Sequence, residues 1–483
     1  MSTSFYPLLA PAVADLIRTA YGVLLLAMLI AALPQARRYF LSERWGGYGQ
    51  RGIAVEFIHN PLMLPILLIV WMGAAVALVL GRLVVPAALV NALLCHYFFV
   101  QMRWRGVLRG MGAPGFIAYW LGVAVLLVEY TRRHAPELHG VALLVLQVDF
   151  ALVMLSAGIY KFSAGYRHNN GMELGMVNPE WGYWTAFWAR LPPSAWWFRV
   201  FNELAWLTEV VAAVLMLLPP TRALGGMLIL VSFVFIATQI RLGFLAEMVI
   251  VCCLLFVSPD SMVSPWLESV FAGARAPDVV AGPVVVNAML GAGLWIYLLL
   301  LPLVRAGLMY NFYAKKSLPS WIQRPFEAYT NLFGLILWRV FSADITNFFV
   351  QIRERDRDGT TRLISDWGRS LRFRQVAESI TVTSLFTTLK YYPSNRKLFT
   401  ERLLRYARTI PHATGSTLVF EYVSVVKRDD RFDFVAIAEY EVDVRRASVA
   451  EHVFDNTVSV HRPAAASPIH EGAHPGSYVP LRR

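Results

Sequence analysis

Long apolar segments separated by short polar ones fill the first two thirds of the chain. About nine of them approach the ~20 residues that a helix needs to cross the hydrocarbon core of a bilayer. Several are joined by only a few residues, as at Gly81-Arg82 and Arg241-Leu242-Gly243, so consecutive helices should be antiparallel neighbours. The pattern predicts an all-α polytopic membrane bundle with about nine transmembrane helices. The expected spans are 12–34, 61–81, 83–101, 115–130, 139–161, 196–219, 223–241, 242–258 and 280–304.

The pattern changes after Val304. Residues 318–345 mix apolar and polar positions, which is typical of an amphipathic helix on a membrane surface. Two hairpins are expected beyond it, turning at 356–359 and 428–431, with a helix at 398–410. This region predicts a small C-terminal α+β soluble domain. The expected division is a transmembrane domain over 1–317, an interfacial helix over 318–345, a soluble domain over 346–455 and a disordered tail over 456–483.

Composition indicates an integral membrane protein. It therefore changes how the positive net charge of the chain is interpreted. Hydrophobic residues make up 57% of the chain and charged residues only 16%, and the mean hydropathy is +0.50. A net charge of +12 could indicate nucleic acid. However, the arginines lie between apolar segments and no nucleic-acid module is recognisable, so we expect the lipid bilayer as a partner and no nucleic acid. The three cysteines lie inside apolar runs without metal-ligand spacing, so no metal site is predicted.

The basic residues also predict an orientation. With nine spans, one side of the membrane would carry more than twice as many of them as the other. The positive-inside rule places the richer side, which holds Lys161 and the C-terminal domain, in the cytoplasm. The richer side would carry Arg37, Arg38, Arg44, Arg51, Arg103, Arg105, Arg109, Lys161, Arg167, Arg190, Arg241, Arg305, Lys315 and Lys316. The poorer side would carry Arg18, Arg82, Arg132, Arg133, Arg222 and Arg275.

Lys161 is the residue that raises a chemical question. It ends an apolar run, and it is the only lysine before Lys315, whereas the other cations in that region are arginines. Arginine stays protonated in proteins, but a desolvated lysine can lose its proton near neutral pH. Burial would therefore make Lys161 a candidate catalytic base. The alternative is a lysine whose amine reaches from the helix end to the headgroups.

Polar residues inside the spans form the candidate surroundings of this lysine. Gln147 and Lys161 are fourteen residues apart and lie on nearly one face of a helix, from which Asp149 points away. On the next span, spacings of four and three place three residues in one stripe, namely Asn202, Trp206 and Glu209. Glu247 lies inside the eighth span. A lysine that faces Glu209 or Glu247 could instead form a structural ion pair, and for the two glutamates we favour that interpretation.

An aromatic loop follows the Lys161 helix. Residues 178–198 contain five tryptophans, which suit an interfacial segment because indole is amphipathic. Anchoring in the interfacial belt is the simpler interpretation, and a lid over a lipid-like or quinone-like ligand is the alternative. The candidate site is thus Lys161 as the catalytic residue. Its candidate substrate-binding residues are Tyr160, Gln147, Asn202, Trp206, Glu209 and Trp184.

Short motifs resemble the vitamin K-dependent γ-carboxylase superfamily, whose bacterial members are called the HTTM (horizontally transferred transmembrane) domain family. They are Ala157-Gly158-Ile159-Tyr160-Lys161-Phe162, then Gly171-Met172-Glu173, Leu207-Thr208-Glu209, Leu217 to Arg222, and Phe341-Ser342-Ala343-Asp344. The resemblance covers roughly residues 12–370. It implies a bacterial inner-membrane protein in which Lys161 deprotonates a hydroquinone cofactor.

The chain also departs from the family pattern. Two family histidines would fall near 108–112 and 233–235, where this sequence has none. The large lumenal region that binds the carboxylase's peptide substrates is replaced by a domain of about 110 residues. The resemblance therefore implies deprotonation of a hydroquinone by Lys161 more directly than it implies carboxylation of glutamate.

Three functional hypotheses follow. The first is an enzyme with a Lys161-centred site for a quinone or lipid-linked substrate, or one that modifies a partner peptide. The second is a non-catalytic membrane subunit that assists maturation, assembly or export of a partner protein, with the C-terminal domain as its docking surface. The third is a transporter, which Glu209 and Glu247 favour but which the lack of internal repeats disfavours.

Overall fold

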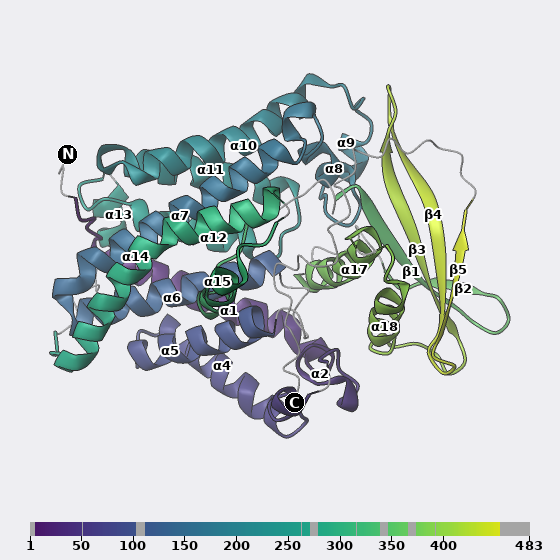
Figure 1. Cartoon of the computed structure of the whole chain (residues 1–483), viewed down its shortest axis with the longest axis horizontal. Helices are drawn as coiled ribbons and strands as arrows, with labels where there is room; N and C mark the ends of the chain where they lie inside the picture. Colours follow the sequence, from purple (N-terminus) through teal and green to yellow (C-terminus); the bar gives the residue numbers. More distant parts are fainter. Residues whose placement is uncertain are drawn as a thin grey trace.

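The computed structural model describes residues 5–50, 52–102, 112–261, 263–270, 279–314, 316–338, 346–365, 373–391 and 393–454. A bundle of helices is followed by a small domain of strands and helices that lies against one end of it (Figure 1). We call this end of the bundle the domain end and the opposite one the far end. The longer helices of the bundle are α1 (Pro11–Ala32), α4 (Met63–Val79), α5 (Val84–Cys95), α6 (Gly112–His134), α7 (Pro136–Ser163), α10 (Trp196–Leu217), α11 (Arg222–Gln239), α12 (Leu245–Cys253) and α14 (Val284–Tyr313). The shorter ones are α2 (Ala36–Phe40), α3 (Ile53–Glu56), α8 (Met172–Val177), α9 (Thr185–Trp188) and α13 (Val263–Val270).

Seven helices in the described part of the chain are long and apolar enough to cross a membrane. The chain is thus a multi-pass membrane protein by length and composition, but the expected count of about nine spans is not confirmed. Two expected spans correspond to shorter helices, Met63–Val79 with 17 residues and the segment Leu245–Phe256. The second is short because the residues before it leave the helical conformation. Arg241 N donates to Trp181 O at 2.7 Å, so this stretch bonds to the aromatic loop instead.

The α7 helix lies inside the bundle, where it packs against α6, α10 and α14. A glycine allows the close approach of α10. A Cβ atom on Gly158 would lie 2.7 Å from Val210 Cγ2 and 2.8 Å from the Trp206 carbonyl oxygen. This contact fixes the two helices side by side just before Lys161 on α7.

The C-terminal domain is a five-stranded antiparallel sheet with two helices on one face. The strand order is β2-β1-β3-β4-β5. Aromatic side chains of the helices, such as Phe386 and Phe399, pack on Phe420 and Tyr440 of the sheet. Both predicted hairpins and the predicted helix are present. The elements are β1 (Phe348–Arg355), β2 (Thr361–Leu363), α17 (Phe373–Tyr391), α18 (Arg396–Ala407), β3 (Thr417–Lys427), β4 (Phe432–Asp443) and β5 (Ser448–Val453).

The segment between bundle and domain is a shorter helix than expected. α15 covers Ser320–Phe333 and ends at Gly334, whose φ of 65° lies in the left-handed region. Gly307 of α14 packs on Phe326 of α15, so α15 lies against the bundle. The predicted junction motif at 341–344 and the tail from 456 lie outside the described residues.

Candidate functional site

Lys161 forms a buried ion pair with Glu209. Its Nζ donates to Glu209 Oε1 at 2.5 Å, and the two residues are only 2% and 1% exposed. The amine therefore points from α7 at α10 and does not reach the headgroups. Desolvating two charges costs roughly several kcal/mol per ion, so the pair persists only because each charge compensates the other. This arrangement matches the structural ion pair that the sequence analysis favoured for Glu209.

One oxygen of the pair lacks a partner. No donor among the described residues reaches Glu209 Oε2, although this atom is buried. Buried polar atoms in folded proteins are nearly always hydrogen-bonded, and an orphaned acceptor costs about 1–3 kcal/mol. The pair therefore presents an acceptor that a hydroxyl or amine donor of a ligand could satisfy.

A second buried polar group lies at the domain end, between α8, α10 and the C-terminal domain. Glu173 is fully buried and accepts hydrogen bonds from Gly171 N at 3.1 Å and from Asn202 Nδ2 at 2.7 Å. Lys427, at the end of β3, donates to the Glu173 carboxylate and to the carbonyl oxygen of Asn169. We call Asn169, Glu173, Asn202 and Lys427 the Glu173 cluster. It fastens the C-terminal domain to the bundle.

Tyr166 lies between the ion pair and this cluster. It is fully buried, and its ring fills the space beside Gly171, where a Cβ atom would come within 2.6 Å of ring atoms. The charges of both Glu209 and Glu173 act on its hydroxyl. Tyr166 thus lies within range of the charges of both glutamates.

The structure brings some of the predicted site residues together. Glu209 is the direct partner of Lys161, and Asn202 belongs to the Glu173 cluster. Tyr160 is buried but turns toward α14, where its ring centroid lies 5.6 Å from that of Phe312. Trp206 is half-buried and donates to Glu203 at 2.9 Å, so its indole nitrogen does not face the lysine.

Two predicted residues lie elsewhere. Gln147 is about 21 Å from Lys161 along the helix axis, given 1.5 Å per residue. It donates to the Leu255 carbonyl at 2.7 Å. Trp184 is 58% exposed and donates to the Thr238 carbonyl at 2.9 Å, which suits an interfacial anchor rather than a lid over the lysine.

Asp149 forms a separate buried pair on the same helix. Its Oδ1 accepts from Arg305 of α14 at 2.8 Å, and its Oδ2 accepts from Trp120 at 2.9 Å and from Tyr297 at 3.0 Å. Both carboxylate oxygens of Asp149 therefore have partners, whereas Oε2 of Glu209 has none among the described residues. The prediction that Asp149 points away from Lys161 is confirmed.

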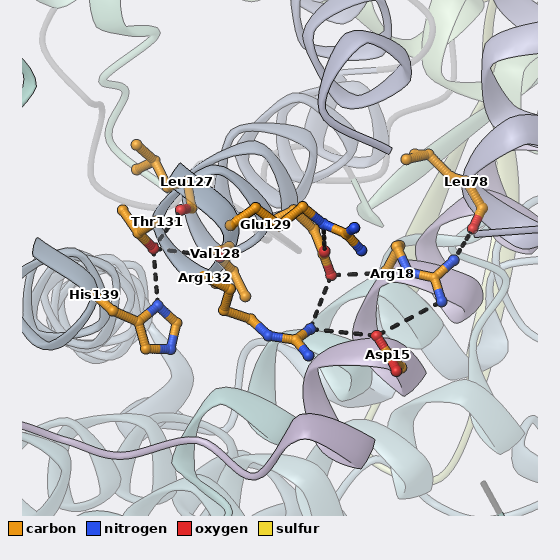
Figure 2. Close-up of polar contacts among 10 residues, drawn as sticks. Asp15, Arg18, Leu78, Leu127, Val128, Glu129, Thr131, Arg132 and His139 are labelled. Atoms are coloured by element: carbon orange, nitrogen blue, oxygen red, sulfur yellow. Dashed lines mark hydrogen bonds and ion pairs between the residues drawn. The ribbon is translucent and has the colours of Figure 1, made fainter. Parts of the chain in front are cut away.

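A larger charge cluster at the far end was not foreseen from the sequence. Figure 2 shows Glu129 between Arg18 and Arg132. The Glu129 carboxylate lies 3.7 Å from Arg18, 3.2 Å from Arg132 and 3.1 Å from Arg133. Asp15 accepts from Arg132 at 3.2 Å, and Arg18 also donates to the Leu78 carbonyl at the end of α4. Because the cluster joins α1, α4 and α6 and Glu129 is only 1% exposed, we assign it a structural role.

The loop between α8 and α9 contacts the buried start of β1. Asn178 Nδ2 donates to the carbonyl oxygens of Thr346 and Phe348, each at 2.8 Å. Glu180 is fully buried and accepts from Thr383 of α17 at 3.0 Å. Burial raises the pKa of Glu180 to about 8, while the hydrogen bond from Thr383 opposes the rise.

An open hollow of about 490 Å³ lies beside the Glu173 cluster. The turn between β3 and β4 supplies Lys427, Arg428 and Asp429, and the segment after α7 supplies His168 to Asn170. The remaining wall is Pro193 and Ser194, just ahead of α10. The hollow therefore lies on the seam between the bundle and the C-terminal domain.

Sequence reasoning missed Tyr166, Asn169 and Lys427. Lys427 contacts Glu173 across 254 residues, and no local pattern marks such a partner.

Among the described residues, no group of three or more His, Cys, Asp or Glu side chains could hold a metal ion. Comparisons with family models, curated proteins and solved structures give no match. The fold brings Lys161, Glu209 and Glu173 to one end of the bundle.

Proposed function

We propose that this chain is a carboxylase-like membrane enzyme whose Lys161–Glu209 pair exchanges a proton with a lipid-soluble ligand that bears a hydroxyl group. A hydroquinone or a lipid-linked substrate belongs to this class. The observation that carries the proposal is the unpartnered Glu209 Oε2 beside a buried ammonium. A ligand hydroxyl that donates to Oε2 would supply the missing hydrogen bond.

The residues fit a hydroquinone in this respect, because a phenolic hydroxyl is a donor and Glu209 Oε2 needs one. When bound, a hydroquinone would supply the electron-rich ring that reacts with an oxidant. The pair would handle the proton. Lys161 passes one ammonium proton to Glu209, and the resulting amine accepts the hydroxyl proton, so the pair gains the one proton that the hydroxyl gives up.

Ligand extraction tests the proposal most directly. The detergent-solubilised full chain is extracted for quinones and lipids, in the wild type, in Glu209→Gln and in Asp149→Asn. We expect a co-purified ligand in the wild type, a loss of about tenfold in Glu209→Gln, the change expected for one charge-assisted hydrogen bond, and no loss in Asp149→Asn. A wild-type extract free of such ligands, or equal retention by Glu209→Gln, would refute the proposal.

Lys161→Arg separates binding from chemistry. Arginine keeps the charge beside Glu209 but cannot become a neutral amine. We expect the variant to retain the ligand and to lose the oxidation of added hydroquinone, followed as oxygen consumption. Full activity in this variant would rule out a base role for Lys161.

A second candidate is a non-catalytic subunit that assists maturation, assembly or export of a partner protein. The exposed edge strand β5 of the docked C-terminal domain favours it, because an unpaired strand can accept an extended partner segment. In that case the extract would be clean and Lys161→Arg would be silent.

The proposed location is the bacterial inner membrane, with the domain end in the cytoplasm because basic residues are more frequent there. Accessibility of a cysteine placed in the exposed 356–359 turn to an impermeant reagent on intact cells tests the orientation. Labelling without lysis would reverse it.

A further inference from the structure

The hollow on the seam presents charges of both signs. Lys427 uses two donors, on Glu173 and Asn169, so the third donor of its ammonium is left for a ligand. Arg428 is exposed, and only its Nε is used, on Asp433 at 2.9 Å. No cation among the described residues pairs with the neighbouring Asp429. The wall therefore offers two cations and one anion to the same occupant.

Two exposed tryptophans lie close to the hollow. Trp196 and Trp197 follow its Pro193–Ser194 wall directly, and they are 58% and 46% exposed. Their rings stack with centroids 3.6 Å apart. Exposed indoles at a helix end prefer the boundary between headgroups and hydrocarbon.

An aromatic strip leads from the hollow toward the middle of the bundle. The Arg167 guanidinium, next to His168 of the wall, lies 4.7 Å from the Phe162 ring centroid. The Phe162 ring in turn lies 4.9 Å from the ring of Trp206 on α10. Phe162 is 37% exposed, so the strip can lie along an acyl chain.

We infer that the hollow binds the head of a zwitterionic phospholipid, with its phosphate toward Lys427 and Arg428 and its ammonium toward Asp429. The volume of about 490 Å³ falls within the size of small-molecule sites. Charge-assisted hydrogen bonds to phosphate supply affinity, and Asp429 supplies the preference over anionic lipids. The bound lipid would bridge the bundle and the C-terminal domain. This inference is independent of any catalytic role of Lys161.

Native mass spectrometry of the full chain in detergent tests the site. Phosphatidylethanolamine and phosphatidylglycerol are added in equal amounts to the wild type, to Arg428→Gln and to Asp429→Asn. We expect the wild type to retain phosphatidylethanolamine preferentially. Arg428→Gln should retain about tenfold less of it, as expected for one lost charge-assisted hydrogen bond. Asp429→Asn should abolish the preference between the two lipids.

Arg431→Gln is the matched control, because Arg431 is on the same turn and also pairs with Asp433 but does not line the hollow. It should leave lipid retention unchanged. Equal retention of both lipids by the wild type, or an unchanged preference in Asp429→Asn, overturns the inference. Glycerophosphoethanolamine, added as a soluble competitor, should not displace the lipid. Displacement at equal concentration would assign the site to a soluble headgroup compound instead.

Glu209→Gln distinguishes this inference from the proposed function. The variant should keep phosphatidylethanolamine, because Glu209 does not line the hollow. Loss of the phospholipid in Glu209→Gln would mean that the two sites are one.

Discussion

Replacement of Lys161 by methionine would leave the Glu209 carboxylate buried without a counter-charge. The two side chains are 3% and 1% exposed, so the cost belongs to buried pairs, about 3–5 kcal/mol, rather than to surface pairs at about 0–1 kcal/mol. At about 2 °C per kcal/mol, the melting temperature should fall by roughly 6–10 °C. The double variant Lys161→Met/Glu209→Leu removes both charges and fills similar volume, so it should recover most of that loss.

The assay is thermal denaturation in detergent, followed by size-exclusion chromatography of the heated sample. Together with the single variant Glu209→Leu, these proteins form a double-mutant cycle that gives the coupling free energy of the two residues without knowledge of the substrate. A double variant as unstable as Lys161→Met would contradict the buried-pair account. The double variant should also lack any ligand held by Glu209, which separates stability from binding.

Three further outcomes are expected. Glu129→Gln should destabilise the bundle by about 3–5 kcal/mol because it leaves Arg133 without a carboxylate and Arg18 and Arg132 with Asp15 alone. Asp15→Asn, at a side chain 16% exposed, should cost less, and equal melting curves of the two variants would contradict this. The stability that Glu180 contributes is complete below its ordinary pKa of 4.5 and is lost as pH rises from there through about 8. The melting temperature of the wild type should therefore fall between about pH 5 and pH 8, and this fall should be absent in Glu180→Gln. Gly158→Val should push α7 and α10 apart and lower the melting temperature, whereas Gly73→Val, where a Cβ atom meets nothing, should not.

The charged residues of the bundle show which contacts the sequence can predict and which it cannot. Helical spacing was enough to predict that Asp149 points away from Lys161 and that Glu209 lies on a polar stripe. It could not choose between Glu209 and Glu247 as the partner of Lys161, because that choice depends on how each helix is rotated against its neighbours. Helical spacing also placed Gln147 in the candidate site, which was wrong. Two residues on one face of a helix can still lie far apart along the helix axis, and Gln147 bonds to Leu255 instead.

The predicted count of about nine spans is not confirmed for a related reason. Hydropathy gives the length of an apolar run, but backbone hydrogen bonds decide where a helix ends. The extended stretch before α12 bonds to the loop at Trp181, and no periodicity in either segment foretells that pairing. The far-end cluster around Glu129 was missed because its members come from separate helices.

The amino-acid sequence alone determined the membrane bundle, the two hairpins of the C-terminal domain and the isolation of Lys161 among arginines. These features depend on local composition and on periods of a few residues, which every segment carries with it. Tertiary structure alone decided that Lys161 meets Glu209 and that Lys427 closes over Glu173. The first contact joins residues 48 positions apart in the sequence, and the second joins residues 254 positions apart. Burying these charges is favourable only when each meets its partner, and the partners meet only once the helices and the sheet are packed.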